Sequence, residues 1–301
     1  MFPTGPNLQQ SPLTPVLVCI FAAVLFGLWW MPIRYLESMG VSGTQTAIYS
    51  NLGGALVLVA WLAGNPDRML VGRRAAIGAV LVGFSFALYS IALAMSDVVR
   101  VILLFYLAPA WGKIIEWAFL GQPWRRSASL TLAASLMGAF LVLGGELSLQ
   151  AINLGDAMAI LSGMTWAIGA TLIFTGGRPA APALTLGALV ATILTALAFA
   201  LVRGEPVLPD VPATTLMQAI LVGLLVSVPT LVLTLWSAQR MSPALISFVF
   251  TFELLVGVVS GALLLDEPFG LMQASGCMLI VSAALIEVLA ALQARHAQSA
   301  G

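Results

Sequence analysis

The chain has 301 residues, of which 60% are hydrophobic and only 8% are charged. A soluble domain carries about a quarter charged residues, so a water-soluble globular protein is excluded and we expect the lipid bilayer to surround most of the chain. The formal net charge of zero argues against a nucleic-acid partner.

Apolar runs of about 20 residues, the length that crosses the hydrocarbon core, recur along the whole sequence. We interpret the first as a retained span and not a cleaved signal peptide, because no Lys or Arg precedes it. Breaks at Gly, Pro and charged residues give ten predicted spans: residues 15–35, 42–63, 75–95, 99–120, 127–143, 157–175, 183–202, 215–238, 243–265 and 271–292. The predicted fold class is therefore an all-α membrane protein with ten transmembrane helices.

The connectors between the predicted spans differ in charge from one side of the membrane to the other. With ten spans, the even connectors share a side with both termini. That side carries eight arginines and one acid, whereas the opposite side carries three arginines and eight acids. Because cytoplasmic loops are enriched in Lys and Arg, we expect both termini to be cytoplasmic.

Two pairs of helices repeat a motif, which indicates an internal duplication. Residues 105–124, from Phe-Tyr-Leu-Ala-Pro to Gly-Gln-Pro-Trp, align with residues 250–269, which end in Asp-Glu-Pro-Phe. Gly27-x-x-Trp30 of the first span matches Gly163-x-x-Trp166 of the sixth. Residues 1–146 and 147–301 then hold five helices each, and an odd number forces the second half to be inverted. Inverted repeats around a site at the bilayer midplane are typical of secondary transporters, so we predict two inverted five-helix repeats around a central cavity.

The paired motifs and the five-plus-five layout resemble EamA-type members of the drug/metabolite transporter superfamily, over essentially the whole chain. Two residues depart from the family pattern, since Gln122 replaces a Glu and Leu254 replaces a Pro. The Phe105-Tyr106-Leu107-x-Pro109 and Gly163-x-x-Trp166 segments resemble bacterial exporters of aromatic amino acids. The resemblance implies a multi-pass exporter of aromatic and other neutral amino acids in the bacterial inner membrane. We expect alternating access, no cofactor and a monomer.

Aromatic side chains are the candidates for substrate contact, because ring faces offer a large apolar contact area. The predicted substrate-binding residues are Trp166, Tyr89, Phe86, Tyr106 and Trp30. For each of them the alternative is helix packing. Trp29 is expected to face outward, because adjacent residues lie about 100° apart on a helix.

Glu253 is the deepest acid in the predicted spans, and ionisable residues within the membrane are functional candidates. We predict that it serves gating or coupling, with a structural hydrogen bond as the alternative. Pro109 and Pro229 join it as gating candidates, because a proline inside a span frees a backbone carbonyl. Lys113 and Glu116 lie one helical turn apart and are expected to pair.

Several function classes are excluded or weakened by the sequence. Cys19, Cys277 and the lone His296 cannot build a disulfide framework, a metal site or a histidine-based catalytic centre. No G-x-x-x-x-G-K motif exists, so the chain does not hydrolyse ATP itself. A multidrug or cationic-metabolite exporter that uses Glu253 remains an alternative, and an intramembrane enzyme is a weaker one. Facilitated diffusion and proton antiport both stay open.

Overall fold

A computed structural model of the chain describes residues 13–96, 98–121, 123–124, 126–142, 153–264 and 270–299. Within these ranges the chain is helical and contains no β-strand. The predicted boundary between the halves, at residues 146 and 147, and Gln122 lie outside the described residues. The helices are α1 (Thr14–Gly27), α2 (Trp30–Ser38), α3 (Gly43–Ala63), η1 (Pro66–Arg68), α4 (Arg73–Met95), α5 (Val98–Phe105), α6 (Ala108–Phe119), α7 (Arg126–Val142), α8 (Leu154–Thr175), α9 (Ala181–Arg203), α10 (Ala213–Val222), η3 (Gly223–Ser227), α11 (Val228–Ala238), α12 (Pro243–Leu264) and α13 (Leu271–Ser299).

In every range predicted to span the membrane, the described residues are mainly helical. In the described part of the chain, six segments are long and apolar enough to cross a bilayer: α1–α2, α3, α4, α8, α9 and α10–α11. Shorter apolar helical stretches lie in α7, α12 and α13, at Ala128–Gly138, Leu245–Gly261 and Leu271–Ala283. The protein is therefore a multi-pass helical membrane protein.

Three segments are interrupted near a proline, which lacks a backbone N–H and clashes with the preceding turn. The first break separates α1 from α2 at Leu28 and Trp29, before Pro32. The second separates α5 from α6, where Pro109 is the second residue of α6. In the third, Pro229 follows the π-helical turn η3. These breaks change the direction in which neighbouring side chains point.

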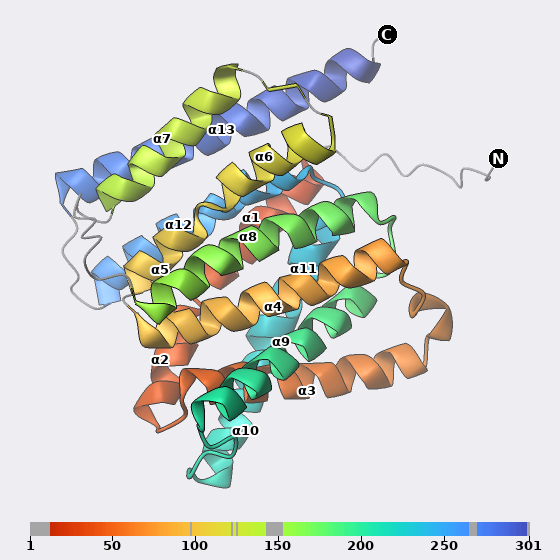
Figure 1. Ribbon diagram of the computed structural model, residues 1–301, viewed down its shortest axis with the longest axis vertical. Coiled ribbons are helices and arrows are strands. Elements are labelled where there is room, and N and C mark those ends of the chain that lie inside the picture. The colour runs from red at the N-terminus through yellow and green to blue at the C-terminus, as the bar shows by residue number, and fades with distance from the viewer. Residues whose placement is uncertain are drawn as a thin grey trace.

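Figure 1 shows the helices stacked from one edge of the bundle to the other. At one edge α7 and α13 lie side by side, followed by α6 and α12, and at the opposite edge α3 packs on α9. The centre contains α1, α4, α8 and α12, with α4 packed on α8 and α1 packed on α12. The core of the protein thus combines helices that are far apart in the sequence.

Close crossings between these helices depend on small residues. The backbone of Gly223 in η3 lies so near α3 that a Cβ there would overlap the carbonyl oxygen of Ser50. Small residues let membrane helices approach until their backbones touch. This crossing brings η3 against the middle of α3, where it forms part of the pocket described below.

Candidate functional site

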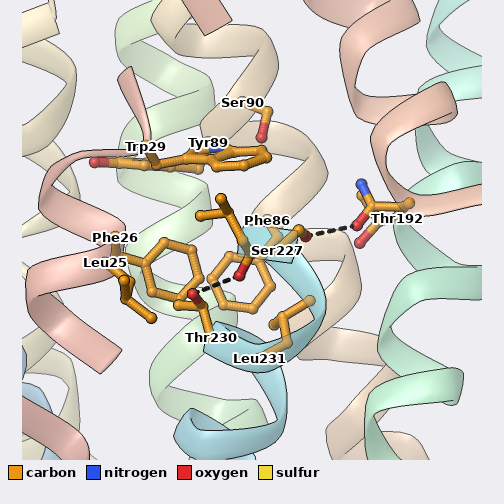
Figure 2. Close-up of a pocket in the computed structure, with 12 residues that line it drawn as sticks. Leu25, Phe26, Trp29, Phe86, Tyr89, Ser90, Thr192, Ser227, Thr230 and Leu231 are labelled. Carbon is orange, nitrogen blue, oxygen red and sulfur yellow. Dashed lines mark hydrogen bonds between the residues drawn. The ribbon is translucent and has the colours of Figure 1, made fainter. Parts of the chain in front are cut away.

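A small pocket lies near the middle of the bundle, where helices from the N-terminal and C-terminal parts of the chain meet (Figure 2). Its volume is about 20 Å³, which has room for about one water molecule. The structure therefore shows this region closed. The residues that line it are Leu25, Phe26, Trp29, Asn51, Phe86, Tyr89, Ser90, Thr192, Val226, Ser227, Thr230 and Leu231.

One wall of the pocket is polar but uncharged. The hydroxyl of Ser227 donates a hydrogen bond of 3.1 Å to Oδ1 of Asn51, and Nδ2 of Asn51 donates to the carbonyl of Ala47 at 2.7 Å. The first of these bonds joins η3 to α3. Thr230 donates to the carbonyl of Val226 at 2.6 Å. Amides and hydroxyls can both donate and accept hydrogen bonds, so this wall can bind a polar solute that carries no strong net charge.

The pocket also adjoins four aromatic rings, which we call the aromatic quartet: Phe26, Phe86, Trp166 and Phe250. Phe26 and Phe86 stack with centroids 5.1 Å apart, and Figure 2 shows their rings side by side. Trp166 lies 5.9 Å from Phe86 and 5.4 Å from Phe250, and Phe250 lies 5.6 Å from Phe26. The rings come from α1, α4, α8 and α12, so the quartet closes the centre of the bundle.

Trp166 is the most buried member of the quartet, with 1% of its surface exposed. Its indole N–H has no hydrogen-bond partner among the described residues. A buried donor without an acceptor costs about 1–3 kcal/mol. The closed arrangement therefore leaves a donor unsatisfied immediately behind the pocket.

A second buried group, the tyrosine–glutamate cluster, consists of Tyr89, Tyr106 and Glu253. Tyr89 donates to Oε1 of Glu253 at 2.8 Å, and Tyr106 contacts Oε2 at 3.4 Å. No Lys or Arg of the described residues forms an ion pair with this carboxyl group, which is 2% exposed. Glu253 does not line the pocket, whereas Tyr89 contacts both the pocket and the carboxyl group.

Tyr106 also contacts the backbone of α12. Its hydroxyl lies 2.8 Å from the carbonyl oxygen of Phe250 and 3.1 Å from the amide nitrogen of Leu254. These two backbone groups are four residues apart, so the hydroxyl of Tyr106 contacts the carbonyl and the amide that face each other in one turn of α12. The break between α5 and α6 places Tyr106 in this position.

Pro109 removes the donor that would bond the carbonyl of Phe105. That carbonyl faces Gly163 of α8, where an added Cβ would lie 2.5 Å from the oxygen. Irregular backbone at membrane depth is tolerated where it is buried in protein. Pro109 thus shapes the α5–α8 crossing, and Pro229 is the second residue after the π-helical turn that ends at Ser227.

The structure brings together most of the residues predicted for the site, but in different roles. Phe86 and Tyr89 line the pocket, Trp166 belongs to the quartet, and Tyr106 binds α12. Trp30 lies outside the pocket, where its indole donates to Ser260 of α12 at 3.0 Å. The prediction that Lys113 and Glu116 pair is confirmed by a distance of 3.6 Å between their charged groups.

The prediction that Trp29 faces outward is wrong. Trp29 is 7% exposed and lines the pocket. The 100° rule fails here because α1 ends at Gly27 and α2 begins at Trp30, so Trp29 lies in the break between two helices. Only the proline at position 32 signalled that break in the sequence.

Other residues of the pocket and of the aromatic quartet had little signal in the sequence. Asn51 was an amide inside an apolar run, which is costly in a membrane, and Phe250 was part of the repeated motif. Thr192 and Ser227 resemble many other hydroxyl residues in apolar helices. Among the described residues, no group of His, Cys, Asp and Glu side chains could hold a metal ion.

Comparisons with known proteins agree with this architecture. The family model described as the EamA-like transporter family matches residues 13–144 and 153–289. No curated protein matches the chain. Among solved structures 29 chains match, and one of them, a crystal structure, is 17% identical with a TM-score of 0.69, covering 94% of this chain and 99% of that chain. At that identity the likeness shows a shared fold.

Proposed function

Because the chain belongs to the EamA-like transporter family, we propose that it exports small neutral or zwitterionic solutes, above all aromatic and other hydrophobic amino acids. The observation that carries the proposal is the uncharged central pocket, which is lined both by aromatic rings and by amide and hydroxyl groups. Rings suit an apolar side chain, and hydrogen-bonding groups suit an amino-acid backbone that carries both charges. The resemblance to bacterial aromatic amino acid exporters supports the inner membrane as its location.

Transport by alternating access between two inverted halves is supported by the packing of the helices. In the correspondence predicted from the motifs, α8 is the counterpart of α1. The packing of α4 on α8 then corresponds to the packing of α11 on α1. In the same way, the packing of α5–α6 on α8 corresponds to the packing of α12 on α1. Likewise α4 packs on α9 as α10 packs on α3. The motif glycines behave alike, since Gly27 lies against the carbonyl of Glu253 and Gly163 against that of Phe105. On this basis the α5–α6 pair, α7, α12 and α13 complete ten spans.

The placement of charge supports cytoplasmic termini. Arg34 pairs with Glu37 at 3.3 Å, and Arg203 pairs with Glu205 at 3.8 Å, at one end of the helices. At the other end Arg73, Arg74 and Arg178 form no ion pair with a described acid. An excess of arginines is typical of the cytoplasmic side, and Figure 1 shows α13 ending on the side of the bundle from which α1 begins.

The closed pocket suggests how a solute would enter the site. We infer that separation of Phe26 from Phe86 widens the pocket and exposes the N–H of Trp166, which then donates to the carboxylate of the solute. This step would satisfy a donor that has no partner in the closed state. The alternative of a cationic-drug exporter receives less support, because two tyrosines already bind the carboxyl group of Glu253.

Flux of labelled tryptophan into liposomes that contain the purified protein tests the proposal. We expect uptake that unlabelled phenylalanine reduces and a quaternary amine does not. Asn51→Leu should lower the flux about ten-fold, the effect of losing one hydrogen bond to a charged group. Asn65→Leu is the matched control, because Asn65 is half-buried near the end of α3, away from the pocket, and its side-chain amide donates to the carbonyl of Trp61.

Two outcomes would contradict this function. Competition by the quaternary amine without competition by phenylalanine would favour the cationic-drug alternative. Absence of flux for every neutral amino acid would remove the amino-acid proposal and leave the family assignment intact. Repeating the assay with and without a pH gradient decides between facilitated diffusion and obligatory proton coupling.

A further inference from the structure

A second cavity, of about 510 Å³, lies between α6 and α8, with the start of α4 at one end. We call it the α6–α8 groove. It is separate from the central pocket, with which it shares no lining residue. Met164 and Ile168 line it, each two positions from Trp166 on α8, so the groove and the aromatic quartet adjoin the same turn of that helix.

The groove is long and narrow in the direction of the helices. On α8 it extends from Met164 to Thr175, a separation of 11 positions, which corresponds to about 16 Å of helix at about 1.5 Å per residue. Half of the hydrocarbon core of a bilayer measures about 15 Å. The groove therefore has the depth of one leaflet.

The lining of the groove changes from apolar to cationic along this length. Side chains from Trp111 and Met164 down to Phe119 are mainly apolar, and Phe119 is 80% exposed. Thr171 also lines this part, and its hydroxyl donates to the carbonyl of Ala167 at 2.8 Å. The hydroxyl of Thr175 donates to the carbonyl of Thr171 at 2.9 Å, so its proton is already used within the helix. Arg74, at the end of the groove, forms no ion pair with a described acid. An occupant would need an extended apolar part and an anionic end.

We propose that the α6–α8 groove binds one acyl chain of an anionic phospholipid of the cytoplasmic leaflet, with the lipid phosphate against Arg74. The leaflet assignment rests on the orientation proposed above, whereas the lipid itself follows from the length and charge of the groove. Cationic side chains at the cytoplasmic surface attract anionic lipids. A chain in the groove packs against Met164 and Ile168 and thereby supports the helix that carries Trp166.

Retention of lipid by the purified full-length protein tests this site. Delipidated protein is mixed with phosphatidylglycerol, phosphatidylcholine or inorganic phosphate, and bound lipid is counted by native mass spectrometry while the melting temperature is followed. We expect one retained phosphatidylglycerol and a higher melting temperature, with no effect of phosphate alone. Arg74→Gln should raise the lipid concentration required roughly five-fold, the effect of one cation near an anionic surface.

The matched control is Arg68→Gln, which removes a cation from the same end of the helices, where Arg68 lies over the ring of Trp61 at 5.3 Å. It should retain phosphatidylglycerol as the unsubstituted protein does. Ile168→Trp, which fills the groove without changing charge, should abolish retention. Equal losses in Arg68→Gln and Arg74→Gln, equal retention of phosphatidylcholine, or full retention in Ile168→Trp would each overturn the proposal. Tryptophan flux is a separate measurement, so failure of one proposal does not decide the other.

Discussion

The hydroxyl of Tyr89 donates a hydrogen bond of 2.8 Å to the carboxyl group of Glu253, 164 positions further along the chain. The bond joins α4 to α12, and Tyr106 of the turn after α5 adds a second contact to the same carboxyl group. Both tyrosines belong to the N-terminal part of the chain and the acid to the C-terminal part. Any movement that separates α12 from α4 and α5 must therefore break these contacts.

Replacing Tyr89 by Phe removes one hydrogen bond and keeps the ring. Hydrogen bonds to charged groups contribute about 1.5–3 kcal/mol, so we expect the free energy of unfolding to fall by about 2 kcal/mol, measured by denaturation in detergent. Tyr35→Phe is the control, because Tyr35 is 49% exposed and its hydroxyl forms no hydrogen bond with a described residue. Equal stability of the two variants would show that the Tyr89 bond contributes nothing.

Replacing Tyr106 by Phe should destabilise the protein more than Tyr89→Phe. Its hydroxyl contacts the carbonyl of Phe250, the amide of Leu254 and the carboxyl group of Glu253. An intramolecular hydrogen bond contributes about 0.5–1.5 kcal/mol, so we expect the loss of all three contacts to lower the free energy of unfolding by about 3 kcal/mol. Thermal denaturation of both single variants under the same conditions ranks them, and the reverse order would refute the role of the backbone contacts.

Gly223→Ala should prevent correct packing of η3 on α3. A Cβ at this position would overlap the carbonyl oxygen of Ser50, and the backbone of two helices cannot yield as a flexible side chain does. Gly187→Ala is the control, because its added Cβ would meet only Ala79, at 3.4 Å, and Ala favours helix over Gly by about 1 kcal/mol. Size-exclusion profiles should show aggregation of the first variant alone, and a monodisperse Gly223→Ala protein would contradict the crossing.

Trp166→Phe separates the role of the indole N–H from that of the ring. Because the N–H has no partner in the closed state, its removal should offset the cost of the smaller ring and leave stability within about 1 kcal/mol. Affinity for tryptophan, measured by calorimetry, should fall about five-fold or more. Trp117→Phe, at an exposed position of α6, should change neither quantity. Unchanged affinity in Trp166→Phe would remove the N–H from the proposed site.

Much of the helical layout could be predicted from the sequence, because apolar runs end at residues with strong local effects. The segment predicted at residues 243–265 is α12 (Pro243–Leu264), and Pro109 correctly marked irregular backbone near Phe105. The position of Trp29 could not be predicted in the same way. Helical spacing applies only within an unbroken helix, and the break at Leu28 and Trp29 turns the ring toward the pocket.

The partners of the predicted residues were beyond the reach of the sequence. Glu253 was identified from its depth, but its two tyrosines are 147 and 164 positions away. Asn51 and Ser227 meet only because η3 crosses α3 at a glycine. Such contacts depend on tertiary packing, which the local periodicity of the sequence does not predict.

The small volume of the central pocket has a consequence for the movement of protons across the membrane. A space of about 20 Å³ holds about one water molecule, and four aromatic rings adjoin it. Protons hop efficiently only along an unbroken file of hydrogen-bonded waters, and no such file fits through this space. The pocket by itself therefore provides no file of water along which protons could cross the membrane.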